Sequence, residues 1–263
     1  MRAQTHLDPA TVSSAAGPQF PEDGSFGPGR SERVPGGTVT RYATLAPELA
    51  GALARWLAEG AVREGTPLKP PFVHRLGGLI VKLFPPPSVF GLFRKPRSQR
   101  SAERYFDCLP VRTPRPLAAF AGGIGSASLL VREYVAGALL AEVWAEDERA
   151  DEDLALFLAR MNRQGLFHGD LHPRNLLWSG EWVLLDPDGL RHGLHDWKRV
   201  LEGQWARFLV HLEGRERVER LFRRVAEHGR ALGGLPVEVD WTRVLAREGA
   251  LRATRERTLG NAR

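Results

Sequence analysis

Hydrophobic residues follow two kinds of pattern along the chain, and the strand-like pattern dominates its first half. Short apolar runs at residues 71–76 and 79–84 are joined by Gly77-Gly78, a two-residue connection typical of a tight hairpin turn. Two further runs, at residues 117–120 and 129–135, predict a second pair of strands. The first half should therefore contain a small sheet.

Helical periodicity separates the two strand pairs and then takes over. In residues 101–109 apolar side chains recur at positions i, i+3, i+4 and i+7, which predicts an amphipathic helix. Apolar residues at helical spacing also precede the first hairpin, over residues 43–59. After Gly137 one apolar stripe covers residues 154–161, a second hairpin is predicted at residues 176–185, and helical stripes continue to the C-terminus. This order predicts an α+β protein.

The pattern also suggests how the chain divides. Residues 1–40 contain five Pro, six Gly and four Ser without a sustained apolar period, so we expect a disordered tail there. Residues 41–135 should form an N-lobe built from the sheet and one helix. Residues 136–263 should form a helical C-lobe that contains the second hairpin.

Composition narrows the class of protein. With 263 residues and 43% hydrophobic residues, the chain can bury a substantial core, which excludes a wholly disordered protein. Its one cysteine, Cys108, excludes an intrachain disulfide and a thiolate-rich zinc site. No apolar run approaches the roughly 20 residues that span a bilayer, and the start lacks the apolar stretch of a secretory signal. We therefore expect a cytoplasmic protein.

Positive charge is concentrated in one stretch. Between Lys69 and Arg104 there are eight cationic residues and one acidic residue, Glu103, within a chain of net charge +6. Nucleic acid, a phosphorylated glycolipid and an anionic membrane surface would all satisfy this charge, and so would a solvated basic face without a partner. Charge alone does not choose among them.

The segment richest in chemistry is His168-Gly169-Asp170-Leu171-His172-Pro173-Arg174-Asn175, followed after a predicted hairpin by Asp186. The hairpin should return Asp186 to the side of Asn175. Asp170 can accept a proton from a hydroxyl group, whereas Asn175 and Asp186 offer the hard oxygen ligands that Mg²⁺ prefers when phosphates also hold it. The D-x-x-x-x-N spacing, then a hairpin, then Asp, is the pattern of the catalytic half of a protein-kinase-like site.

Taken in order, these motifs resemble the lipopolysaccharide kinase family, which comprises Kdo and heptose kinases within the protein-kinase-like superfamily. The resemblance covers roughly residues 71–212. It implies a two-lobed fold, with an antiparallel-sheet N-lobe and a helical C-lobe. The segments that carry it besides the catalytic loop are the lysine strand at 79–84, the glutamate helix at 101–104, residues 113–118 before the fourth strand, and the hinge at 130–135.

The resemblance assigns four residues of the first half to ATP. Lys82 would hold the α and β phosphates, and Glu103 would orient Lys82 through an ion pair. Backbone groups near Glu133 and Val135 would bind the edge of the adenine ring. These roles belong to the family pattern, because a strand lysine or a helix glutamate alone would indicate nothing.

In the second half, the resemblance makes Asp170 the residue that accepts or orients the acceptor hydroxyl. Asn175 and Asp186 would hold Mg²⁺, and His168 would brace the loop. Asp188 places a second carboxylate beside Asp186, so that sharing of the metal between them stays open. ATP and Mg²⁺ are thus the expected cofactors.

Several departures from protein kinases bear on the acceptor. No G-x-G-x-x-G loop precedes the lysine strand, where only Gly60 and Gly65 occur, and no A-P-E follows Asp186. Pro187 occupies the position of the DFG phenylalanine. The chain soon enters the helix that contains Trp205, which leaves little room for a peptide-binding segment and favours a small-molecule or glycolipid acceptor.

We therefore predict an ATP-dependent kinase that phosphorylates a sugar hydroxyl, by resemblance that of Kdo or heptose in the lipopolysaccharide inner core. Two alternatives stay open. One is a kinase-like phosphotransferase for another small molecule or a protein. The other is a non-catalytic nucleotide-binding module, which the missing glycine-rich loop favours and the retained Lys82 and Asp170 disfavour. The expected partner is a glycolipid or small-molecule sugar acceptor. Peripheral contact with the anionic cytoplasmic face of the inner membrane stays open, and we expect no nucleic-acid partner.

Overall fold

The computed structural model describes most of the chain from residue 29 onward and divides it into two compact units. The described residues are 29–34, 37–42, 51–53, 55–56, 59, 62, 65–69, 72–86, 95–107, 111–122, 126–146, 150–192, 196–233 and 239–260. Unit 1 comprises residues 1–107 and 114–135, and unit 2 comprises residues 108–113 and 136–263. The boundary after Val135 coincides with the end of the N-lobe expected from the sequence.

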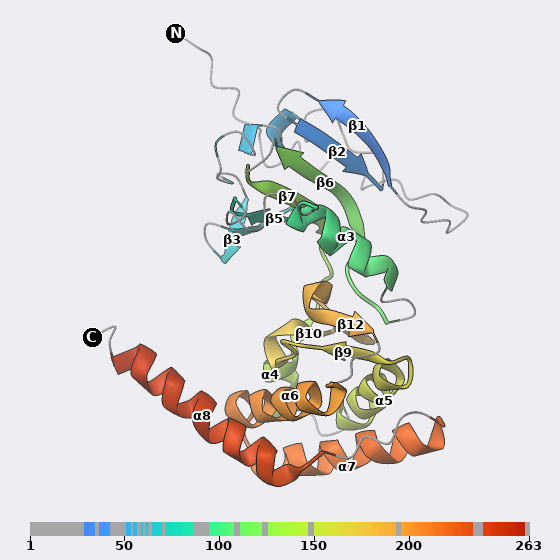
Figure 1. Cartoon of the computed structure of the whole chain (residues 1–263), viewed down its shortest axis with the longest axis vertical. Helices are drawn as coiled ribbons and strands as arrows, with labels where there is room; N and C mark the ends of the chain where they lie inside the picture. The colour runs from blue at the N-terminus through green and yellow to red at the C-terminus, as the bar shows by residue number, and fades with distance from the viewer. Residues whose placement is uncertain are drawn as a thin grey trace. The chain divides into compact units, whose positions relative to one another are not determined.

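Unit 1 contains a seven-stranded antiparallel sheet (Figure 1). Its strand order is β1-β2-β6-β7-β5-β4-β3. The four predicted strands form its centre and one side, as β4, β5, β6 and β7. The strand bounds are β1 Arg30–Val34, β2 Gly37–Arg41, β3 Thr66–Lys69, β4 Val73–Leu76, β5 Leu79–Phe84, β6 Pro116–Gly122 and β7 Ser128–Glu133.

The expected tail over residues 1–40 is wrong for its last part. Strands β1 and β2 pair with each other, and β2 continues the sheet along β6. Both strands are short and largely polar, so they lack the alternation that signals a strand. Pairing of β2 with β6, and of β1 with β2, stabilises them instead. Gly37 lies opposite Gly122, where a Cβ atom at Gly37 would clash with the Ala121 carbonyl oxygen. Residues 1–28 lie outside the described part of the chain.

A different helical segment packs against each face of the sheet. On one face Val81, Leu83, Leu129 and Val131 pack with Trp56, which belongs to the helical residues 51–53, 55–56 and 59 of the predicted segment 43–59. On the other face lies helix α3, Arg97–Asp107, which begins four residues before the predicted helix (Figure 1). The alternation of β5 and β7 thus sorts their apolar side chains between two small cores.

Helix α3 is fastened to the sheet by buried polar contacts as well as by packing. Ala102 packs against Phe84 and Leu130. The Ser98 hydroxyl donates to the Phe120 carbonyl oxygen at 3.0 Å, and the buried Arg132 guanidinium donates to the Ser101 hydroxyl at 2.6 Å. These contacts fix α3 over β5 and β7.

Unit 2 is helical with three small strand pairings around the predicted catalytic segment. Strand β10 pairs with β8 and β11, and β9 pairs with β12. The bounds are β8 Ala138–Leu139, α4 Leu140–Glu146, α5 Ala150–Arg163, β9 Leu166–His168, η2 Pro173–Asn175, β10 Leu176–Trp178, β11 Trp182–Leu184, η3 Pro187–Gly189, β12 Leu190–His192, α6 Trp197–His211, α7 Arg215–Ala231 and α8 Trp241–Gly260. The protein therefore has the predicted α+β organisation, with a first part built on an antiparallel sheet and a helical second part.

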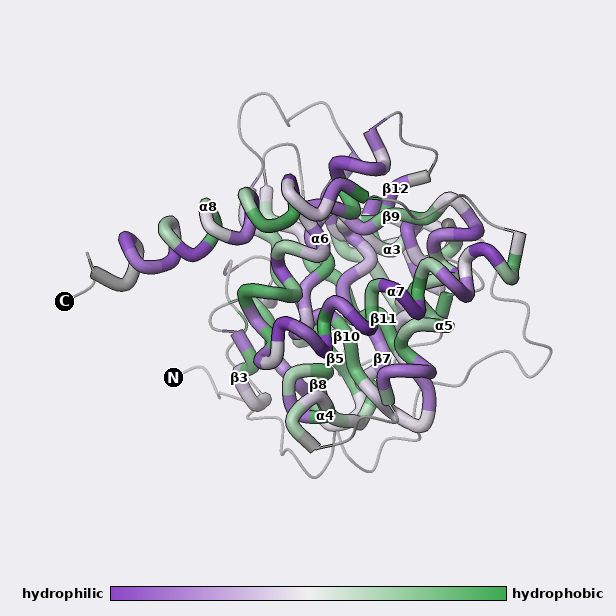
Figure 2. The backbone as a smooth tube through the Cα atoms, turned by 90° about the horizontal axis from the view of Figure 1, so that it is seen from below, coloured by the Kyte–Doolittle hydropathy of each residue, from purple (hydrophilic) through white to green (hydrophobic). Residues whose placement is uncertain are grey.

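The core of unit 2 combines apolar packing with one buried ion pair. Trp205 and Phe208 of α6 pack edge to face, and Trp205 also meets Phe222 of α7. Between α5 and α7, Asp151 receives two hydrogen bonds from the guanidinium of Arg217, at 2.8 and 2.9 Å, with both side chains largely buried. Hydrophilic and hydrophobic residues alternate along α7 and α8 (Figure 2). This pattern is expected for helices that place one face in a core.

None of the helices in the described part of the chain is both long enough and apolar enough to span a bilayer.

Candidate active site

The predicted catalytic segment forms one continuous loop and hairpin in unit 2. Strand β9 ends at His168, Asp170 and Leu171 follow, and the 3-10 turn η2 ends at Asn175. Strands β10 and β11 pair in antiparallel register, with Leu176 opposite Leu184. The Leu185 amide donates to the Asn175 carbonyl oxygen at 2.8 Å. Asp186 therefore begins its segment directly beside Asn175, as the sequence predicts.

Two side chains tie the Asp170 loop to its neighbours. The buried His168 imidazole donates from Nε2 to the Asp186 carbonyl oxygen at 2.6 Å and accepts at Nδ1 from the Asp170 amide at 3.1 Å. The Asn175 side-chain amide donates to the Asp170 carbonyl oxygen at 3.1 Å. The backbone at Asp170 is thus held from both sides, and one imidazole joins it to Asp186.

These contacts define the protonation state of His168. A carbonyl oxygen can only accept and an amide N–H can only donate, so the ring is the neutral tautomer with its proton on Nε2. Burial lowers the pKa of His168, while its hydrogen bond to Asp186 and the nearby carboxylates oppose the shift. Because its nitrogens are both engaged within the loop, His168 braces the segment, as predicted.

Gly189 makes room for this imidazole. A Cβ atom at Gly189 would lie 2.6 Å from Cε1 of His168, closer than any packing contact allows. The Gly169 amide also donates to the Gly189 carbonyl oxygen at 2.9 Å, across the pairing of β9 and β12. Gly189 is therefore required by close packing against the loop.

The oxygens near Asn175 and Asp186 suit a magnesium ion. The side-chain nitrogen of Asn175 donates to the Asp170 carbonyl oxygen, so the side-chain oxygen of Asn175 is the atom that can act as a metal ligand or hydrogen-bond acceptor. Asp186 and Asp188 supply carboxylates, and Oδ1 of Asp186 accepts a long hydrogen bond of 3.5 Å from the Asp188 amide. Within the described ranges, no three His, Cys, Asp or Glu side chains gather as a metal cluster. Such a donor set fits an ion that substrate phosphates complete.

Asp170 itself projects toward solvent beside positive charge. Its side chain is 68% exposed, and Oδ1 lies 3.2 Å from Nε of Arg207 on α6. Two histidines lie nearby, His172 in the loop and His211 at the end of α6, with ring centroids 5.9 Å apart. Burial lowers the pKa of both imidazoles. The charge of Asp170 opposes this shift at both rings, and the charge of Arg174 adds to it. An exposed carboxylate of this kind can reach an acceptor hydroxyl.

Lys82 lies at the centre of the sheet in unit 1. It is opposite Leu130 on β7, and its alternation places it on the face that α3 covers. The ammonium group lies 5.0 Å from the ring centroid of Phe84, and the guanidinium of Arg97 on α3 lies 5.4 Å from the same ring. A half-buried lysine with a cationic neighbour is suited to bind phosphate.

Glu103 lies on α3, the helix predicted to carry it, and it contacts the basic stretch. Its Oε1 accepts a hydrogen bond from Nζ of Lys95 at 2.8 Å, with both groups substantially exposed. Burial and the charge of Glu103 raise the pKa of the Tyr42 hydroxyl to about 12. The proposed orientation of Lys82 by Glu103 stays a prediction, and Arg94 of the basic stretch lies outside the described residues.

The expected adenine-binding residues lie at the end of unit 1. The carboxylate of Glu133 accepts from the backbone amide of Arg115 at 3.0 Å and from its guanidinium at 2.8 Å. Its own amide donates to the Arg115 carbonyl oxygen at 3.0 Å. These bonds anchor the β7 end to the segment before β6, and Val135 follows as the last residue of the unit. Binding of adenine there stays a prediction.

Arg207 is the functional candidate that the sequence did not reveal. It lies 37 positions after Asp170 on a helix whose visible pattern is the apolar stripe of Trp205, Phe208 and Leu209. An arginine on the polar side of such a stripe resembles any solvated residue. Only the packing of α6 against β9 brings it to Asp170.

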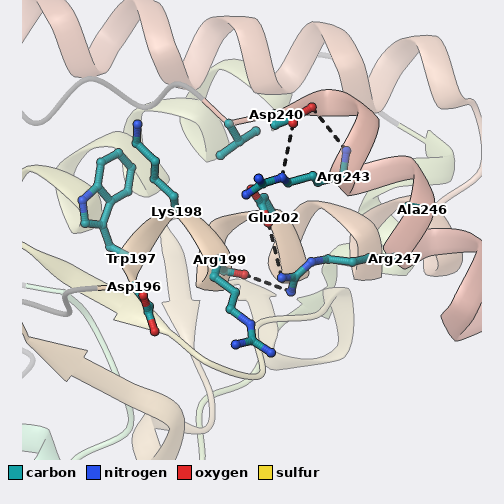
Figure 3. A pocket seen from close by; sticks show the side chains of 10 residues that line it. Asp196, Trp197, Lys198, Arg199, Glu202, Asp240, Arg243, Ala246 and Arg247 are labelled. Atoms are coloured by element: carbon teal, nitrogen blue, oxygen red, sulfur yellow. Dashed lines mark hydrogen bonds and ion pairs between the residues drawn. The ribbon is translucent and has the colours of Figure 1, made fainter.

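A cleft of about 1010 Å³ lies along α6 and α8 (Figure 3). Its floor includes the buried Glu202, which pairs with Arg247 at 3.3 Å. Arg243 pairs with Asp240 at 3.3 Å and lies 3.9 Å from Glu202. Gly203 of α6 lies beside two arginines, because a Cβ atom there would lie 3.4 Å from Nη1 of Arg207 and 3.5 Å from Nη1 of Arg247. Arg247 lines the cleft, whereas Arg207 pairs with Asp170.

Comparison with known families agrees with this arrangement. Residues 30–195 match the model of the phosphotransferase enzyme family, abbreviated APH. The chain belongs to this phosphotransferase family. The match begins at β1 and ends just after β12, so it includes Lys82, Asp170, Asn175 and Asp186. Membership of a kinase-like phosphotransferase family, expected from the motifs, is confirmed.

Solved structures similar to this phosphotransferase include two named proteins. WaaP in complex with acyl carrier protein is 17% identical, with a TM-score of 0.46, and the match covers 83% of this chain and 98% of that one. The bifunctional kinase-methyltransferase WbdD is 18% identical, with a TM-score of 0.39, and the match covers 68% of this chain and 41% of WbdD. A search of curated protein sequences gave no match.

Proposed function

We propose that this phosphotransferase is an ATP- and Mg²⁺-dependent kinase that phosphorylates a sugar hydroxyl, and that the sugar is Kdo or heptose of the lipopolysaccharide inner core. One observation supports the proposed kinase activity most strongly: His168 and Asn175 link the segments that contain Asp170 and Asp186 through hydrogen bonds. The proposed base and the proposed metal ligands thereby belong to one hydrogen-bonded framework. The sugar rests on the motif resemblance to lipopolysaccharide kinases.

Each residue of the loop has a defined task in this reaction. Asp170 would accept, or at least orient, the proton of the acceptor hydroxyl as that oxygen attacks the γ-phosphorus atom. Its exposure allows an acceptor to approach, while the contacts of its backbone amide and carbonyl keep its position. Arg207 would orient the carboxylate through their ion pair. His168 would hold the loop without exchanging protons.

Asn175 and Asp186 would hold Mg²⁺, with Asp188 as a second carboxylate nearby. When bound, the ion would supply neutralisation of the charge that develops on the phosphate oxygens. Lys82 would pair with the α and β phosphates of ATP, and backbone groups near Glu133 and Val135 would receive the adenine. The family membership supports this assignment, since phosphoryl transfer needs these groups in this order.

A sugar acceptor is favoured over a peptide by the short path after the metal segment. Turn η3 ends at Gly189, and α6 already begins at Trp197. Strand β12, which pairs with β9, uses part of this interval. Little chain is left there to form a platform for a peptide, whereas a small acceptor needs none.

The test is transfer of label from γ-labelled ATP, with Mg²⁺, to a panel of core oligosaccharides, aminoglycosides and peptides. We expect labelled core oligosaccharide, and loss of labelling by roughly 10²- to 10⁴-fold in the Asp170→Asn variant, with little change in ATP affinity. Asp153→Asn, a change of an exposed aspartate on α5, serves as the matched control. Labelling of aminoglycosides or peptides alone would refute the proposed acceptor, and an unchanged rate in Asp170→Asn would refute the mechanism.

A further inference from the structure

The charges of three arginines from separate elements of unit 2 act on His211 at the end of α6, and one of the three pairs with Asp170. The arginines are Arg174 of η2, Arg207 of α6 and Arg255 of α8, and we call them the cationic cluster. Nothing in the proposed transfer of the phosphoryl group requires Arg174 or Arg255. Their convergence from three elements therefore calls for a different explanation.

Direct contacts place the side chain of Arg207 and the backbone of Arg174. Arg207 lies 3.2 Å from the Asp170 carboxylate. Arg174 follows His172 in the loop, and its backbone amide donates to Nδ1 of that ring at 3.1 Å. The His172 ring in turn lies 5.9 Å from His211, one turn beyond Arg207 on α6. The loop and the end of α6 thus form a single surface.

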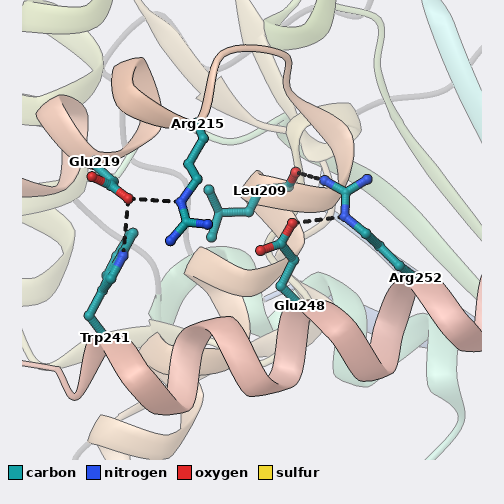
Figure 4. Close-up of polar contacts among 6 residues, drawn as sticks. All are labelled: Leu209, Arg215, Glu219, Trp241, Glu248 and Arg252. Carbon is teal, nitrogen blue, oxygen red and sulfur yellow. Dashed lines mark hydrogen bonds and ion pairs between the residues drawn. The ribbon is translucent and has the colours of Figure 1, made fainter.

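Helix α8 brings the third member to this surface. Arg252 donates from Nη2 to the Leu209 carbonyl oxygen of α6 at 2.8 Å, and from Nε to Glu248 at 2.8 Å (Figure 4). Trp241, at the start of α8, donates to Glu219 of α7 at 3.2 Å, which fastens the other end of the helix. Arg255 lies three residues after Arg252, so it projects from nearly the same side of α8, toward the end of α6.

The charges of all three arginines affect the pKa of His211. Burial lowers the pKa of its imidazole first, and the charges of Arg255, Arg174 and Arg207 lower it further, while Asp170 acts in the opposite direction. One histidine ring thus lies within electrostatic reach of the entire cluster and of the catalytic carboxylate. Three guanidinium charges and one carboxylate therefore act on the same imidazole, so positive charge is in excess around His211.

We propose that the cationic cluster binds an anionic group of the acceptor, a phosphate or a carboxylate, next to the hydroxyl that Asp170 receives. Guanidinium groups bind both anions through paired N–H donors, and Arg174 and Arg255 are exposed enough to do so. The cluster would then select sugars that already carry negative charge. This inference rests on the proposed function, because it assigns the cluster to the acceptor of that reaction.

Three sugars that differ at one position test the proposal: glucose 6-phosphate, glucuronic acid and glucose. Their dissociation constants for the full-length protein, without ATP, are measured by isothermal titration calorimetry. We expect glucose 6-phosphate, glucuronic acid or both to bind at least tenfold more tightly than glucose, and added salt to weaken that preference. The charged sugar with the tighter binding identifies the anion that the cluster prefers.

The double variant R174Q/R255Q should lose this preference by about tenfold or more, as expected when partly exposed charge-assisted hydrogen bonds are removed. R223Q, which neutralises an exposed arginine of α7, should keep it, and R174K/R255K should restore part of it. Equal binding of the three sugars to the wild type, or an undiminished preference in R174Q/R255Q at unchanged thermal stability, would overturn the inference.

The labelling assay separates this inference from the proposed function. If the wild type transfers phosphate to no acceptor, but its preference for charged sugars is absent from R174Q/R255Q, the kinase proposal fails and the anion site stands. If it phosphorylates core oligosaccharide with equal kcat/KM in wild type and R174Q/R255Q, the kinase stands and the anion site fails.

Discussion

Replacement of His168 by leucine tests whether one imidazole holds the proposed catalytic loop together. Leucine has a similar volume and no polar atoms, so the change removes the hydrogen bonds to the Asp186 carbonyl and from the Asp170 amide while the site stays filled. His168 is 1% exposed, so the two backbone groups lose partners where water has little access. The loop should loosen without creating a large cavity.

The magnitude follows from the cost of unsatisfied polar groups. A buried donor or acceptor without a partner costs about 1–3 kcal/mol, so His168→Leu should lower the free energy of unfolding by roughly 2–4 kcal/mol after allowance for partial solvation near Asp170. Phosphoryl transfer should fall at least tenfold, because displacement of a positioned group by a fraction of an ångström already reduces catalysis strongly.

The wild-type pH dependence gives a second signature. The folded-state pKa of His168 is lowered below its ordinary value of 6.5, so the stabilisation is complete above pH 6.5 and is lost as the pH falls below it. The loss should reach up to about 1.4 kcal/mol per pH unit for this group. His168→Leu should not show this component.

Urea unfolding at pH 7.5 and pH 5.5, with the labelling assay, measures these effects. His228→Leu is the matched control, because His228 pairs with Glu152 at a more exposed position and should cost under about 1 kcal/mol. If His168→Leu unfolds at the same urea concentration as the wild type and retains full activity, the bracing role is refuted.

Three further changes test other parts of the account. Gly189→Ala should lower the melting temperature and the activity together, because the clash of the new Cβ atom with the His168 ring should cost about 1–3 kcal/mol of folding free energy. Gly180→Asn, at an open turn of positive φ, should cost less. Equal melting temperatures for Gly189→Ala and the wild type would contradict the packing argument. Arg217→Met should destabilise unit 2 by about 3–5 kcal/mol in urea unfolding because it leaves Asp151 buried without its partner, and a cost under 1 kcal/mol would show that this pair matters little. Mg²⁺ should bind far more tightly in the presence of a non-hydrolysable ATP analogue than without it, since the described residues gather no metal cluster of their own; equal affinities by calorimetry would refute a phosphate-completed site.

Much of the architecture is encoded locally and could be predicted. Strand β5 was predicted with its observed bounds because Leu79–Phe84 is a short apolar run between a Gly-Gly turn and prolines. The hairpin of β10 and β11 and the placement of Asp186 beside Asn175 followed from the same kind of signal. In each case the residues that define the element are neighbours in the sequence.

Features that depend on distant partners escaped prediction. Strand β3 contains Pro67 and is fully exposed, so nothing in its composition indicates a strand, and pairing with β4 alone defines it. Arg112 was assigned to the first lobe, but its carbonyl accepts from the Leu184 amide and its guanidinium pairs with Glu181, and both partners belong to unit 2. Arg207 reaches Asp170 through helix packing for the same reason.

The most direct test of the central claim is a crystal structure with Mg²⁺ and a non-hydrolysable ATP analogue. We predict one ion bound by the side-chain oxygens of Asn175 and Asp186 together with phosphate oxygens, and Asp170 facing the γ-phosphate. A nucleotide bound elsewhere, or an ion that touches neither Asn175 nor Asp186, would contradict the assignment of this loop as the catalytic site.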